Sequence, residues 1–148
     1  MNGFNRFLVA AFMSAAMLLP GAVQAMEIQQ YDKMALQDRA DYVGDLIVGA
    51  QKVLIDEGRS DLADQVHNLF TETPAGDAVP LGMTEFSRNL DRARLADAKR
   101  AAVDPNARRL EVEDAMFVTL KANNIQLPDS FFAVMKDFKP KHAQDKKN

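Results

Sequence analysis

The chain has 148 residues, a formal net charge of −3 and no cysteine. Without cysteine, the protein has neither a disulfide framework nor a thiol nucleophile, and it offers no cysteine for a lipid anchor. The mildly acidic balance argues against nucleic acid as a general partner.

Residues 1–25 have the three parts of a secretory signal peptide. Arg6 supplies a positive charge, residues 7–19 form a run without charged side chains, and a Pro-Gly break then leads to the small residue Ala25. The run is shorter than the roughly 17–25 residues of a membrane-spanning helix. We therefore predict cleavage between Ala25 and Met26, a periplasmic or secreted protein of a Gram-negative bacterial envelope, and no stable membrane anchor after cleavage.

The central helix of the fold is predicted at residues 36–57. Apolar side chains recur there at helical spacing on a broad face, opposite a charged one. Gly44 and Gly49 cost a helix about 1 kcal/mol each relative to Ala, so we expect a neighbouring helix to approach closely at these positions. Residues 27–31, before this helix, predict a short extended piece.

Four further segments carry the same helical period, at residues 61–72, 84–103, 108–123 and 128–140. Thr84 is expected to cap the third helix, because the ten residues before it hold prolines and glycines typical of a loop. The sequence thus predicts an all-α fold, a compact bundle of about five helices after the cleaved signal peptide. This bundle forms one domain, residues 26–140, and residues 141–148 are expected to be a polar disordered tail.

Two helices carry charged stripes of opposite sign. Asp38, Asp41 and Asp45 share one face of the first long helix, and a solvated face is favoured over a weak cation site. The third helix has a basic stripe around Leu95, formed by Arg88, Arg92 and Lys99. A solvated face is favoured here too, but any surface for an anionic partner is expected on this stripe, because Arg binds carboxylate or phosphate with two parallel bonds.

Two acidic residues fall within apolar helix faces, and both are expected to be buried. They are Asp97 and Glu113. A buried pair of carboxyl groups can act as acid and base with shifted pKa values. The favoured interpretation is structural: local ion pairs of Asp97 with Arg94 and Arg100, and of Glu113 with Arg109, would lower both carboxyl pKa values.

The sequence predicts neither a metal site nor a cofactor site. His67 and His142 have no second ligand three or four residues away, and His67 is expected to be packed or hydrogen bonded. The acidic turns at residues 56–61 and 104–106 lack the ligand pattern of a calcium loop.

No nucleophile or phosphate-binding motif is present, so the favoured function is non-catalytic. We expect a protein-interaction module, such as an inhibitor, immunity or accessory protein, which acts on another envelope protein. Its plan resembles those of secreted immunity proteins and periplasmic acid chaperones, groups that typically use a cysteine pair. The alternatives are a carrier in which Met116, Phe131 and Met135 line an apolar ligand site, an acid-stress chaperone, and a hydrolase using Asp97 and Glu113.

Overall fold

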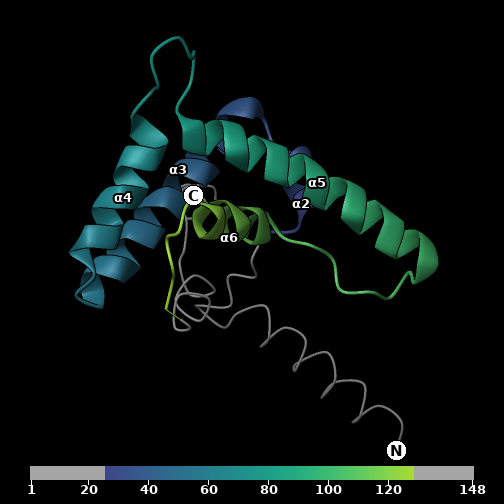
Figure 1. Ribbon diagram of the computed structural model, residues 1–148. Coiled ribbons are helices and arrows are strands. Elements are labelled where there is room, and N and C mark those ends of the chain that lie inside the picture. The colour runs from purple at the N-terminus through teal and green to yellow at the C-terminus, as the bar shows by residue number, and fades with distance from the viewer. Residues whose placement is uncertain (1–25, 129–148) are drawn as a thin grey trace, which may run out of the picture.

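The computed structural model describes residues 26–128, and this part of the chain is helical. The helices are α2 (Ile28–Asp32), α3 (Leu36–Asp56), α4 (Ser60–Thr71), α5 (Leu81–Val103) and α6 (Val112–Ala122) (Figure 1). The all-α prediction is therefore confirmed for these residues. The signal peptide, the fifth predicted helix and the polar tail fall on residues 1–25 and 129–148, outside the described part.

A helical hairpin of α3 and α4 forms one half of the bundle, and α5 packed on α6 forms the other (Figure 1). Gly58, at a φ of +75°, allows the tight turn between α3 and α4. The hydrophobic core lies between the two halves. Its fully buried members include Leu46 and Leu54 of α3, Phe86 of α5 and Met116 of α6.

Residues 27–31 are not an extended piece. Residues 28–32 form the short helix α2, whose Ile28 and Tyr31 are buried in the core. Only Glu27 makes an extended pairing, an antiparallel bridge to Glu111. This bridge ties the start of the described chain to the start of α6.

Helix α5 begins at Leu81, three residues before the predicted cap at Thr84. Gly82 explains the early start, because its missing side chain lets the first turn approach α4. An added Cβ would lie only 2.7 Å from the backbone oxygen of Leu69. The close approach predicted at Gly44 is wrong, since a Cβ there would meet no atom within 4 Å.

Helix α6 begins at Val112, later than the predicted residue 108. The backbone N–H of Glu111 donates to the Asp114 carboxylate at 3.0 Å, which caps the helix there. Residues 104–111 are instead a connection that returns from the end of α5 to α6 (Figure 1). At its other end, α6 stops before Asn124, whose φ of 59° is a left-handed conformation that ends a helix.

Candidate functional site

The first buried acid, Asp97, holds the connection between α5 and α6 in place. Its side chain is only 5% exposed and forms an ion pair with Arg109 at 2.8 Å. Its second oxygen accepts the backbone N–H of Leu110 at 2.9 Å. The predicted local pairs with Arg94 and Arg100 are wrong, because the returning connection brings a better enclosed cation to the carboxylate.

The second buried acid, Glu113, pairs with a tyrosine and not with Arg109. The hydroxyl of Tyr42 in α3 donates to Oε1 of Glu113, whereas Oε2 is buried and has no hydrogen-bond partner among residues 26–128. Burial raises the pKa of Glu113 and also that of Tyr42. The lowered pKa that the sequence suggested for Glu113 is therefore wrong. Sequence spacing could not identify Tyr42, which comes from a different helix.

The two buried acids thus have separate partners. Asp97 forms an ion pair with Arg109, and Glu113 accepts a hydrogen bond from the Tyr42 hydroxyl. Within residues 26–128, no hydrogen bond joins these two carboxyl groups.

A third charged contact fixes α2 against α5. Nε and Nη2 of Arg94 donate to the Asp32 carboxylate at 2.9 and 2.6 Å, in the two-bond geometry of guanidinium and carboxylate. Arg94 also pairs with Asp91. These hydrogen bonds lower the pKa of Asp32 and raise that of Arg94.

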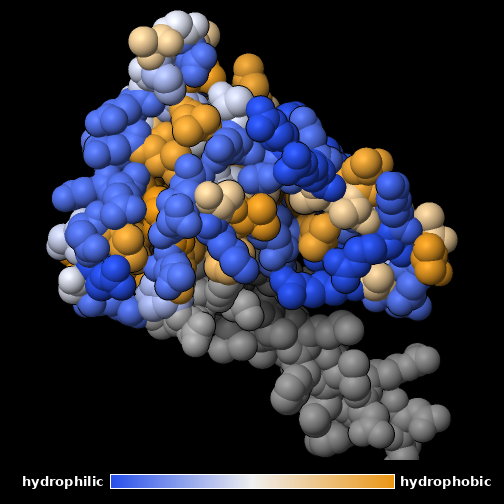
Figure 2. Space-filling model, viewed as in Figure 1, coloured by the Kyte–Doolittle hydropathy of each residue, from blue (hydrophilic) through white to orange (hydrophobic). Residues whose placement is uncertain are grey.

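The outer face of α5 is the strongest candidate surface. It consists of Arg88, Arg92, Leu95, Lys99 and Val103, which follow one another at intervals of four, three, four and four residues. All five are exposed, as the basic stripe predicts, and none of the three cations makes an ion pair within the described part of the chain. Figure 2 shows mainly hydrophilic residues over α5, with apolar ones toward its far end.

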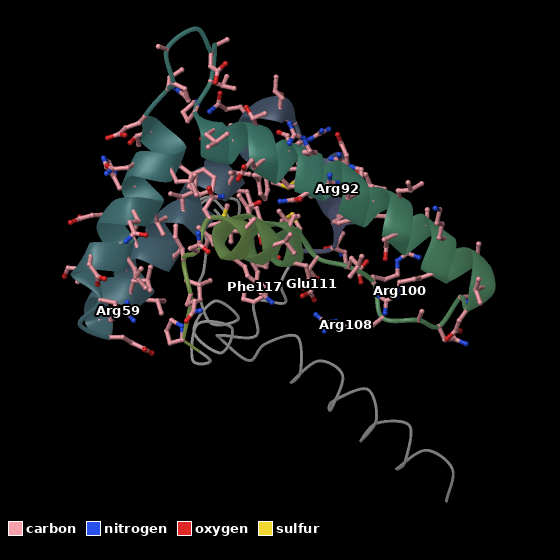
Figure 3. All side chains as sticks on the ribbon, viewed as in Figure 1. Arg59, Arg92, Arg100, Arg108, Glu111 and Phe117 are labelled. Carbon is pink, nitrogen blue, oxygen red and sulfur yellow. The ribbon has the colours of Figure 1, made fainter. Side chains whose placement is uncertain are left out.

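Four other arginines form ion pairs within the fold. Arg59, Arg94, Arg108 and Arg109 pair with acids at 3.3 Å or closer. Figure 3 places Arg92 on α5 and Arg108 with Glu111 on the connection that follows it. Arg88, Arg92 and Lys99 differ from these four arginines in having no ion pair within the described part of the chain.

The side chains of the acidic stripe on α3 are less exposed to solvent than those of a fully solvated face. Asp38, Asp41 and Asp45 are half-buried, and Gln37 donates to Asp41 at 3.0 Å. Within residues 26–128 no cluster of three or more His, Asp or Glu side chains could hold a metal ion. His67 is exposed, and the prediction that it packs or hydrogen bonds through its ring is not confirmed, because only its backbone oxygen accepts a bond, from Thr71.

Two surface grooves of about 400 Å³ each flank the bundle. One lies between α4 and α5, around Leu69 and Leu81, and the other lies between α3 and α5, around Tyr31 and Phe86. Met116, the described member of the predicted carrier site, lines neither groove and is 1% exposed in the core. The other two members, Phe131 and Met135, lie outside the described residues.

Among the helices described, none has the length and apolar character needed to cross a membrane. Comparison of the chain with protein-family models, with curated proteins and with solved structures gives no match. The chemistry of the exposed surface is therefore the basis for the functional proposal.

Proposed function

We propose that this protein is a non-catalytic interaction module of the bacterial envelope that binds an acidic protein surface through the outer face of α5. The observation that carries the proposal is the combination of cations without ion partners and exposed apolar side chains on one helix face. Leu95 is 59% exposed and Val103 is 88% exposed beside Arg88, Arg92 and Lys99. An acidic surface would supply carboxylates to the cations and cover the apolar groups.

Charge distribution supports a directed encounter. The chain as a whole carries a formal net charge of −3, so the basic face stands on an otherwise acidic molecule. Such a patch steers a partner of opposite charge into one orientation and raises the association rate. A membrane surface is a poorer match, because a membrane-binding helix presents a broad apolar face, and the apolar face of α5 is packed in the core.

The envelope location rests on residues 1–25, whose pattern is that of a signal peptide. The protein recovered from the periplasm should begin at Met26, which N-terminal sequencing or intact mass measures. A full-length precursor retained in the inner membrane would contradict this location.

Site-specific photocrosslinking in the periplasm tests the proposed face. A photoreactive residue at position 95 should give an adduct with an acidic protein, and the triple variant Arg88→Glu, Arg92→Glu, Lys99→Glu should reduce that adduct about tenfold or more. Position 55 is the matched control, because Ile55 on α3 is 55% exposed, a fraction similar to the 59% of Leu95. Equal adducts at both positions, adducts with lipid alone, or insensitivity to charge reversal would contradict the proposal.

A further inference from the structure

The start of the described chain is held firmly beside α6. The backbone N–H of Val112 donates to the carbonyl oxygen of Met26 at 2.9 Å, and that of Ile28 donates to Leu110 at 3.3 Å. Ile28 is 2% exposed, so its side chain anchors this segment in the core. The backbone of Met26 is therefore fixed one residue away from Glu113, through its bond to Val112.

Glu113 has no cation beside it among residues 26–128. Its Oε1 accepts a hydrogen bond from the Tyr42 hydroxyl, whereas Oε2 has no hydrogen-bond partner in the described part of the chain, and the residue is only 8% exposed. The other charged group facing it is the Glu111 carboxylate, which repels it and raises its pKa further. A buried carboxylate is costly unless it is paired.

The carbonyl oxygen of Met26 is bonded to Val112, the residue before Glu113, and this bond brings the backbone of Met26 to the pair. The N–H of Met26 lowers the pKa of Glu113 and also that of Tyr42. As part of a peptide bond, this nitrogen offers one neutral donor. As a free chain terminus, it would offer three donors and a positive charge.

We propose that cleavage between Ala25 and Met26 completes this site, because the new α-ammonium group of Met26 pairs with Oε2 of Glu113 and stabilises the fold. This inference rests on the proposed signal-peptide cleavage. Hydrolysis adds water across the peptide bond, so Ala25 leaves with the carboxylate and Met26 keeps the amine. The amine takes up a proton at neutral pH, because the pKa of a chain terminus is about 7.7–8.0.

The two states of the chain should lose stability in different pH ranges as pH rises. With Met26 in a peptide bond, the raised pKa of Glu113 means that the folded state binds more protons, so stability falls as pH rises through the carboxyl's ordinary value of 4.5. With the ammonium present, the pair raises the amine's pKa. Its stabilisation is then complete below the ordinary amine value and is lost as pH rises through the higher folded value.

Two recombinant proteins test the pairing, one beginning at Met26 and the other at Ala25, each released from a fusion without extra residues. They carry the same net charge, but the extra alanine displaces the ammonium group. Near pH 7, we expect the midpoint of thermal unfolding to be about 5 °C or more higher for the Met26 form. In a Glu113→Gln background, the gap between the two forms should shrink to about 1 °C.

Equal midpoints, or the same gap with and without Glu113, would overturn the pairing. If Glu113→Gln does not fold, the acylation rate of the α-amine against pH gives a second readout. The amine pKa should exceed its ordinary value in the Met26 form alone, and an ordinary value there would also overturn the inference. Because the preparation sets the N-terminus, this test is independent of where the cell cleaves the precursor, which intact mass of the periplasmic protein shows separately.

Discussion

Asp97 joins the end of α5 to the connection before α6 through both of its carboxylate oxygens. Replacing it with Ala removes the ion pair to Arg109 and leaves the Leu110 N–H without an acceptor. We expect Asp97→Ala to lower the free energy of unfolding by about 3 kcal/mol, measured by urea denaturation. Asp97→Asn keeps an acceptor for Leu110 and should cost less.

The matched control lies on the same helix. Asp91 also pairs with an arginine, Arg94, but its side chain is 73% exposed. Because water screens an exposed pair, Asp91→Ala should cost less than about 1 kcal/mol. Similar costs for Asp97→Ala and Asp91→Ala would show that the buried pair does not hold the connection.

The sequence identifies both buried acids but not their partners. Helical spacing shows which residues can meet on one helix, and it favoured local cations for Asp97 and Glu113. In the fold, Arg109 reaches Asp97 and Tyr42 reaches Glu113 from other segments. Such partners depend on how the helices pack, which the spacing within a single helix does not contain.

At the scale of whole helices, the contact between α4 and α5 depends on Gly82. An added Cβ would lie 2.7 Å from the backbone oxygen of Leu69, which cannot move without shifting α4. We expect Gly82→Ala to lower the free energy of unfolding by about 1–3 kcal/mol, measured by urea or thermal denaturation.

Gly44 is the opposite case and serves as the control. A Cβ at this position in α3 would meet nothing within 4 Å. Because Ala is a better helix former than Gly, Gly44→Ala should raise the free energy of unfolding by about 0.5–1 kcal/mol. Changes of the same sign at the two glycines would contradict this account of how α5 approaches α4.

Long helices were predictable because their apolar residues repeat over several turns. Helix α3 was predicted at 36–57 and spans Leu36–Asp56. Helix α2 was missed because five residues are too few to show a period, and its helical form depends on burying Ile28 and Tyr31. The start of α5 was misplaced because its contact with α4 at Gly82 sets it, and the start of α6 was misplaced because the cap between Glu111 and Asp114 sets it.

For the whole molecule, the contact of Asp32 with Arg94 ties α2 to α5 and should respond to acid. The arginine's hydrogen bonds lower the pKa of Asp32, so the folded state binds fewer protons there. Its stabilisation is present above the ordinary value of 3.8 and is lost as pH falls through the lower folded value. Asp32→Asn should therefore reduce stability at pH 7, and the difference should shrink in acid. Urea denaturation across this range measures it, and a difference independent of pH would contradict the assignment.

The candidate surface was only partly predictable. The sequence places Arg88, Arg92 and Lys99 on one helix face because their spacing is helical. It does not show that these cations have no ion partner in residues 26–128, while Arg59, Arg94, Arg108 and Arg109 are paired. That distinction requires the positions of all the helices, because an acid from any of them could have neutralised the face.

Native mass spectrometry of the protein isolated from its own periplasm tests the central claim most directly. The account predicts a chain that begins at Met26, in complex with an acidic protein. The complex should disappear in the variant Arg88→Glu, Arg92→Glu, Lys99→Glu and persist in Lys33→Glu, which reverses an exposed cation at the end of α2. A complex that survives the triple charge reversal, or a chain that carries only a small apolar molecule, would contradict it.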